Sequence, residues 1–295
     1  TATIMMPQKS LPNDYEFRSC NNQNIRVREN VDMLSIMIIT LKGIFRDRVF
    51  HGILVVTLLL LLIPVVSQLS MRQVTELSIT LSLSLISFIM LLLAVFLGGT
   101  ALWKDIERRY TYGVLSLPLT RSSYLLGRFC GTAFFMLLAA LVLGSVAMAV
   151  VWFVAAGTPP DRPVVWLNFI FAVFFDAIKY ILLVAIAVLL ATVSSSFFLP
   201  VFGTISAFLV GSSSQQVYDY VNSEQAKGLS LLVRKSATML YYILPNFSAF
   251  DLKVNAIYGL PLAVSGLLLS IGYALVYGGI ILALAAMIFA RREMK

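Results

Sequence analysis

Charged residues are scarce in this sequence. Asp, Glu, Lys and Arg together make up 12% of the 295 residues, about half of the share in an average soluble domain. Hydrophobic residues account for 59% of the chain, and its mean hydropathy is +0.90. A composition this apolar is not explained by a large water-soluble core, so a soluble enzyme is excluded.

Residues for metal, redox and nucleotide chemistry are almost missing too. His51 is the only histidine, and Cys20 and Cys130 are the only cysteines. They provide no zinc-ligand spacing and no disulfide framework. The sequence also lacks a G-x-x-x-x-G-K-[ST] phosphate loop and a G-x-S-x-G nucleophile elbow. We therefore expect no catalytic residue, metal or cofactor in this chain, and no ATPase activity of its own.

Long apolar runs are abundant, and they predict an all-α integral membrane protein with six transmembrane helices. A helix needs about 20 mainly apolar residues to cross a bilayer. We expect Pro64 to kink the first of the six. The predicted spans are 49–69, 77–103, 129–156, 166–193, 197–214 and 262–290.

The remaining parts of the chain are polar or mixed in character. Residues 1–30 are predicted to be a polar cytoplasmic tail, and residues 31–295 to form the transmembrane domain. Within that domain, 215–261 is expected to be a broken external segment. Its short apolar pieces are interrupted by Arg234, Lys235, Pro245 and Asn246.

Residues 31–48 predict an amphipathic interfacial helix ahead of the first span. Apolar side chains recur there at steps of three and four residues, and four charged residues follow between 42 and 48. The alternative is that this stretch begins the first span, but four charges would be costly in hydrocarbon. The apolar face consists of Val31, Leu34, Ile38, Leu41 and Phe45.

The distribution of positive charge predicts an orientation. Fifteen of the 22 Lys and Arg residues lie in the tail and interfacial helix, the 104–128 loop and the C-terminus, six lie in other connections, and Lys179 lies in a span. No basic stripe interleaved with aromatic residues occurs outside the apolar runs, so we expect no nucleic-acid partner. The positive-inside rule predicts a multi-pass protein of the inner (cytoplasmic) cell membrane with both termini in the cytoplasm.

The loop between the second and third spans carries the most informative pattern. It begins with the charged stretch 104–109 and continues through a short amphipathic piece to a Leu117-Pro118 break. Thr and Ser residues that can cap the next helix follow. On this pattern alone, an ordinary solvated loop is an equal alternative.

The same loop resembles the cytoplasmic loop of ABC exporter permeases of the type-2 class. Their loop reads acidic–x–acidic, Gly-Thr, Leu-Ser-x-Pro, Ser/Thr-Arg, an aromatic, Leu and Gly-Lys/Arg. Tyr110 stands where that family usually carries glycine. The 244–247 break and the C-terminal 289–294 segment are similar to the family as well. The matching loop positions are Asp105, Glu107, Thr111, Leu115, Ser116, Pro118, Thr120, Arg121, Tyr124, Leu125, Gly127 and Arg128.

The resemblance implies a permease subunit of an ATP-driven exporter. One six-span half would pair, within the membrane lipid, with a second copy of itself or with a homologous permease. It would couple through the 104–126 loop to a separate cytoplasmic ATPase that binds ATP and Mg²⁺. The docking residues that the resemblance implies are Asp105, Glu107, Arg108, Arg109, Leu115, Leu117, Pro118 and Arg121.

Asp176 and Lys179 are two charges inside the predicted fourth span. One charge at the bilayer centre costs about 2.5–3.5 kcal/mol on insertion scales. At positions i and i+3 the two side chains share a helix face and can partly neutralise each other. They are either a structural pair or a polar point on the translocation path or the dimer seam.

Two other functions remain as alternatives. A secondary transporter or channel driven by an ion gradient favours interrupted, repeated spans and several intramembrane charges. The sequence shows one charge pair and no evident repeat. The other alternative is a membrane anchor of a larger complex, without transport of its own.

Cysteine labelling tests the orientation. In a background without Cys20 and Cys130, Arg162→Cys and Lys227→Cys are expected to react with an impermeant thiol reagent added outside intact cells. Arg121→Cys is expected to stay unlabelled, because it lies in the cytoplasmic loop. Labelling of Arg121→Cys from outside would contradict both the orientation and the docking role of that loop.

Overall fold

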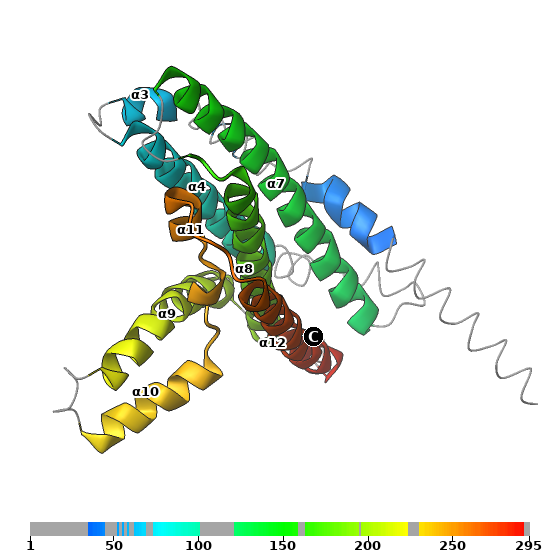
Figure 1. The fold of residues 1–295 in the computed structure, drawn as a ribbon. Coiled ribbons are helices and arrows are strands. Elements are labelled where there is room, and N and C mark those ends of the chain that lie inside the picture. The colour runs from blue at the N-terminus through cyan, green and yellow to red at the C-terminus, as the bar shows by residue number, and fades with distance from the viewer. Residues whose placement is uncertain are drawn as a thin grey trace, which may run out of the picture.

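A computed structural model describes residues 35–44, 52, 55, 58, 62–68, 73–100, 121–158, 163–194, 196–223 and 230–291. The regular structure of these residues is helical, and they contain no strand (Figure 1). After a helix at Ser35–Ile44, the elements are α3 (Ile63–Ser67), α4 (Val74–Leu93), the π-helix η1 (Ala94–Thr100), α7 (Arg121–Gly157), α8 (Trp166–Val193), α9 (Phe198–Asn222), α10 (Leu231–Ile243), the 3₁₀ turn η3 (Ser248–Phe250), α11 (Lys253–Tyr258) and α12 (Val264–Arg291).

Four helical stretches are long and apolar enough to cross a membrane. They are Val74–Gly99, Ser122–Gly157, Trp166–Val193 and Val264–Arg291. The second, third, fourth and sixth predicted spans are therefore confirmed as helices of this kind, and the protein is a multi-pass membrane protein. The fourth agrees with the prediction at both ends. The third begins earlier than predicted, at Arg121.

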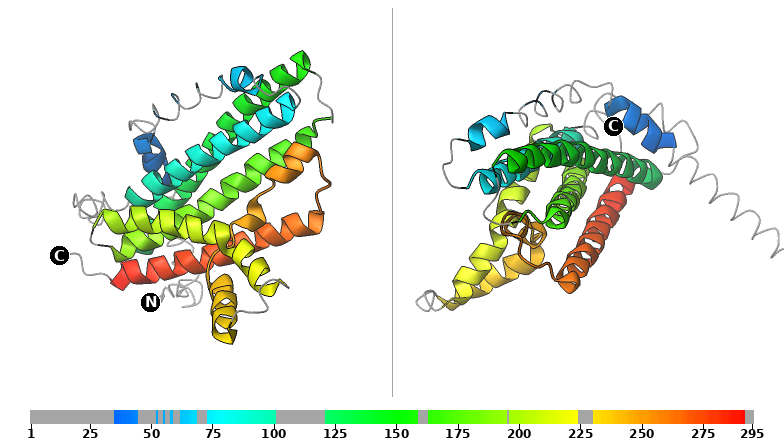
Figure 2. Two further views of the ribbon diagram at one scale, coloured as in Figure 1. Left: turned by 90° about the vertical axis from the view of Figure 1, so that its left-hand side faces the viewer. Right: turned by 45° about the horizontal axis from the view of Figure 1, so that its top comes forward.

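The helix α8 lies at the centre of the bundle. It contacts α7, α9, α12 and η1, and it also touches α4 and α11 (Figure 2). In its most apolar stretch 72% of the residues are buried, against 6% in α12. A helix that is apolar all round is typical of this central position. The exposed apolar side of α12 instead faces the surroundings of the bundle, where lipid can cover it.

Glycines let η1 approach its neighbours closely. A Cβ atom on Gly98 would lie 2.8 Å from the Cβ of Ala187 in α8, and one on Gly99 would lie 3.3 Å from the Cβ of Pro200 in α9. The α-helix α4 becomes a π-helix over this stretch, a local change that often marks a functional region. Gly98 and Gly99 therefore allow a close approach between helices.

The first and fifth predicted spans stay predictions. Most of 49–69 lies outside the described residues, although Pro64 occupies the first turn of α3, where its missing N–H leaves no helical bond unmade. The predicted 197–214 helix forms the first part of α9. That helix continues to Asn222. Because its second half is polar, it is not one of the four helices that are apolar enough to cross a membrane.

The helix Ser35–Ile44 packs on α7 through a face different from the predicted one. Ile36, Thr40 and Ile44 are buried. Thr40 meets α7, because a Cβ atom on Gly131 would lie 2.9 Å from the Thr40 Cβ. Ile38, on the predicted apolar face, is 49% exposed. Leu41, on the same predicted face, is instead partly buried against the core. The interfacial position stays a prediction.

The helices α9 and α10 pair and project from the bundle (Figure 1). Tyr218 of α9 stacks on Tyr241 of α10, with ring centroids 4.3 Å apart. Arg234 and Lys235 interrupt the apolar character of this segment but not its helix, because α10 runs through both exposed residues and Lys and Arg favour a helix. The break expected at Pro245 is confirmed, since α10 ends at Ile243.

Asn246 fastens the segment that follows α10. Its side-chain amide donates to Gln215 Oε1 of α9 at 2.8 Å and to the Tyr241 hydroxyl at 3.2 Å. Its backbone N–H donates to the Tyr273 hydroxyl of α12 at 3.0 Å. The Ser248 N–H completes the turn by donating to Asn246 Oδ1 at 3.1 Å. This one residue therefore links α9, α10 and α12 at the start of the 245–252 segment.

Gly211 is where α9 meets that segment, and its substitution tests the packing. A Cβ atom there would lie 2.5 Å from Phe247 Cδ2 and 2.6 Å from the Pro245 carbonyl oxygen. Gly211→Ala is expected to destabilise the protein by about 1–3 kcal/mol through overpacking. Thermal unfolding of the detergent-purified protein measures this loss.

Gly272→Ala in α12 is the matched control, because a Cβ at Gly272 meets no described atom within 4 Å. The control is expected to unfold at or above the wild-type temperature, since alanine favours a helix. Equal unfolding temperatures for the two variants would contradict the close packing at Gly211.

Candidate functional site

The predicted docking loop is not covered by the structure. Seven of the eight docking positions lie outside the described residues, and the eighth, Arg121, is the first residue of α7. The docking roles therefore stay predictions. The seven positions are Asp105, Glu107, Arg108, Arg109, Leu115, Leu117 and Pro118.

The Asp176–Lys179 pair lies in the central helix α8. Lys179 Nζ forms a salt bridge with Asp176 Oδ1 across one helical turn. Ser87 of α4 donates its hydroxyl to Asp176 Oδ2 at 2.8 Å. Asp176 is 7% exposed and Lys179 is 6% exposed. Both carboxylate oxygens of a buried charge are thereby satisfied, as a low-dielectric site requires.

Aromatic rings line one side of Lys179. Lys179 Nζ lies 4.6 Å from the centroid of the Tyr180 ring, within the range of a cation–π contact. The Tyr180 ring stacks on Phe208 of α9 with centroids 5.8 Å apart. The ring centroids of Phe208 and Phe247 are in turn 6.2 Å apart. Three segments distant in the sequence thus build one aromatic wall beside the ion pair.

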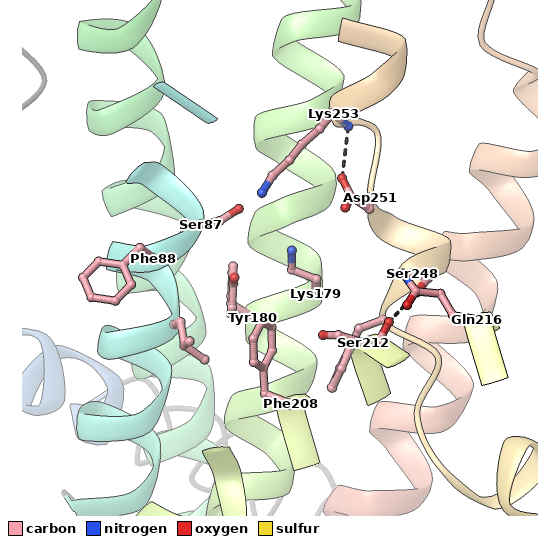
Figure 3. A pocket seen from close by; sticks show the side chains of 12 residues that line it. Ser87, Phe88, Lys179, Tyr180, Phe208, Ser212, Gln216, Ser248, Asp251 and Lys253 are labelled. Carbon is pink, nitrogen blue, oxygen red and sulfur yellow. Dashed lines mark hydrogen bonds between the residues drawn. The ribbon is translucent and has the colours of Figure 1, made fainter. Parts of the chain in front are cut away.

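The ion pair borders a cavity of about 400 Å³ (Figure 3). Its walls come from α4, α8, α9 and the segment from Phe247 to Lys253. Lys179 lines the cavity, whereas Asp176 does not. The acid is turned toward Ser87 and the lysine toward the open space. The structure therefore places one member of the predicted pair on a polar cavity within the helical bundle.

Two further charges on this cavity were missed by the sequence analysis. Asp251 and Lys253 line it from the segment that leads into α11 (Figure 3). Asp251 Oδ1 accepts the backbone N–H of Lys253 at 3.1 Å, which shapes the turn into α11. Asn168 of α8 holds α11 in place by donating to the Asn255 carbonyl oxygen at 3.0 Å. No local sequence signal brings residues this far apart to one cavity.

The side chains of this site can form hydrogen bonds and ion pairs with a polar group. The described residues contain no cluster of three or more His, Cys, Asp or Glu that could hold a metal ion. The side chains on the cavity are ammonium, carboxylate, hydroxyl and amide groups beside aromatic rings. Comparisons with known protein families and with curated proteins found no match.

Substitutions at the ion pair test whether its two charges compensate each other. Lys179→Gln alone leaves the Asp176 carboxylate without its cationic partner and is expected to cost about 3–5 kcal/mol. The double variant Asp176→Asn, Lys179→Gln is expected to regain most of that loss. Unfolding measurements on both single variants and the double variant give the coupling energy.

Lys235→Gln, at an exposed position on α10, is the control and is expected to leave stability unchanged. Additive losses in the double variant would show that the two charges do not compensate each other.

Proposed function

We propose that this protein is the permease subunit of an ATP-driven ABC exporter. It forms one six-span half of the translocation path, in the inner membrane, with both termini in the cytoplasm. The proposed partners are a separate cytoplasmic ATPase, which binds ATP and Mg²⁺, and a second permease half. The single observation that carries the transport function is the cavity beside Lys179, lined by three helices of the bundle and by the segment from Phe247 to Lys253.

The cavity supports transport because a membrane anchor has no need of it. Charged residues inside membrane helices are costly, and they are typical of substrate or ion pathways. Lys179 turns toward a space large enough for a small molecule or a headgroup. A residue with only a packing role would be enclosed by protein on all sides.

The position of the proposed docking loop supports coupling to an ATPase. Residues 101–120 connect the end of η1 to the start of α7. Both of these helices contact α8, which carries the ion pair. Displacement of the loop by a moving ATPase would therefore act on two helices that pack against α8, the helix that carries Lys179. The interfacial helix at 31–48 belongs to this proposal as a membrane-surface element next to α7.

The exposed apolar side of α12 supports further partners within the membrane. Leu268, Leu269, Leu275 and Val276 are each more than half exposed. Such a surface requires lipid or another apolar protein surface, and both belong to the proposed assembly.

The competing function is transport driven by an ion gradient. The Asp176–Lys179 pair favours it, because buried acid–base pairs occur in proton and ion pathways. The two functions differ in one measurable property, which is dependence of transport on a cytoplasmic ATPase.

The partner prediction concerns the 104–126 loop. The chain purified alone is expected to hydrolyse no ATP. Coexpressed with its ATPase, it is expected to form a complex that Glu107→Arg or Leu117→Asp weakens about tenfold or more, because a reversed charge or a buried carboxylate opposes docking. Copurification and binding titrations measure this.

Asp219→Arg, at an exposed position near the end of α9, is the matched charge reversal and is expected to leave the complex intact. A fully coupled complex carrying both loop substitutions would refute the docking role.

A further inference from the structure

Lys179 has hydrogen-bonding capacity left after its salt bridge. An ammonium group has three N–H donors, and among the described residues Asp176 is the one hydrogen-bond acceptor of Lys179 Nζ. Asp176 itself has both oxygens engaged, by Lys179 and by Ser87. The remaining Lys179 donors belong to the side chain that faces the cavity. Positive charge, and not negative charge, is therefore what α8 presents to the open space.

Lys253, the first residue of α11, adds a second ammonium group to the cavity. In Figure 3 its side chain extends from the start of α11 toward the space above Lys179 and beside Ser87. Within the described part of the chain, Lys253 Nζ has no salt-bridge partner. The neighbouring Asp251 uses Oδ1 for the backbone N–H of Lys253, so one of its oxygens is committed to the turn. Two ammonium groups from different elements thus converge on one space.

Apart from the two lysines and the Asp251 carboxylate, the cavity is aromatic and weakly polar. Tyr180, Phe208 and Phe247 form the continuous wall beside Lys179. The Ser248 hydroxyl donates a hydrogen bond to the Ser212 carbonyl oxygen at 2.9 Å. The volume of about 400 Å³ is that of a site for a small molecule or a headgroup. The charge therefore recognises one end of a ligand, and the rings suit an apolar or aromatic body.

We propose that this cavity binds the anionic group of an amphipathic molecule, a phosphate monoester or a carboxylate, between Lys179 and Lys253. The apolar part of the ligand lies on the wall of Tyr180, Phe208 and Phe247. That this ligand is the exported substrate rests on the proposed function. That the cavity binds an anion does not. The anion comes either from a lipid headgroup or from a soluble amphipathic compound.

Binding to the purified full-length chain in a neutral maltoside detergent tests the proposal. Phenyl phosphate is the probe, and phenol and inorganic phosphate represent its two halves. Calorimetric titration is expected to show tighter binding of phenyl phosphate than of either half. Lys253→Gln is expected to weaken phenyl phosphate binding about tenfold or more, because a charge-assisted contact is lost. Lys253→Arg is expected to retain most of the affinity.

Lys235→Gln is the matched control, since it removes the same charge from an exposed site on α10. It is expected to bind phenyl phosphate as the wild type does. The double variant Asp176→Asn, Lys179→Gln tests the α8 ammonium group without leaving a buried carboxylate unpaired, and it is expected to bind more weakly. Equal affinity for phenol and phenyl phosphate, unchanged affinity in Lys253→Gln, or an equal loss in Lys235→Gln would each overturn the proposal.

Nanodiscs distinguish the two sources of the anion. If the ligand is a lipid, phosphatidate in a phosphatidylcholine bilayer is expected to displace phenyl phosphate from the wild type but to bind Lys253→Gln poorly. If the ligand is a soluble compound, phosphatidate is expected not to compete. Either result, with the Lys253 dependence, supports the anion site. These measurements need no ATPase, so failure of the ATPase partnership and failure of the anion site are observed separately.

Discussion

The ionic contact between Asp176 and Lys179 sets the constraint on which the arrangement of α4, α8 and α9 depends. Asp176 occupies a helix that is buried on nearly all sides, so its charge must be neutralised where it stands. Lys179 supplies the countercharge one turn away, and Ser87 supplies the remaining hydrogen bond. That bond fixes α4 against α8 at the depth of the carboxylate, and the closely packed Gly98 fixes the same pair of helices further along.

The cavity follows from this arrangement. The helix α9 reaches α8 through the Tyr180–Phe208 stack and reaches η1 at Gly99. It then diverges from the bundle toward α10, and the segment after α10 returns to close the space between α4, α8 and α9. Asn246 directs that return by hydrogen bonds to three helices. The fourth wall of the site is therefore built from a connecting segment and not from a membrane helix.

The sequence predicted what depends on local pattern. Long apolar runs define α4, α7, α8 and α12, and the i, i+3 spacing correctly placed Asp176 and Lys179 together in one span. It did not predict Lys253 on the same cavity, because that depends on the Asn246 contacts with partners up to 31 residues away. It also did not predict that one helix, α10, runs through Arg234 and Lys235, because the two charges interrupt the apolar pattern there.

The surroundings of Asp176 and Lys179 distinguish a structural role of the ion pair from a functional one. A buried salt bridge is weak evidence for stability, because well-packed apolar residues of similar volume often stabilise a protein as much or more. Asp176 and Lys179 are buried to the same extent, so burial does not distinguish them. Their neighbours do: both oxygens of Asp176 are engaged by Ser87 and Lys179, whereas Lys179 lines a cavity that Lys253 also lines from another element. Asp176 offsets the charge of Lys179, and Asp251 lines the same cavity beside Lys253, so the charges of the free protein are partly balanced. Two ammonium groups still line one cavity, and their remaining N–H donors can form strong, charge-assisted hydrogen bonds with a bound anion.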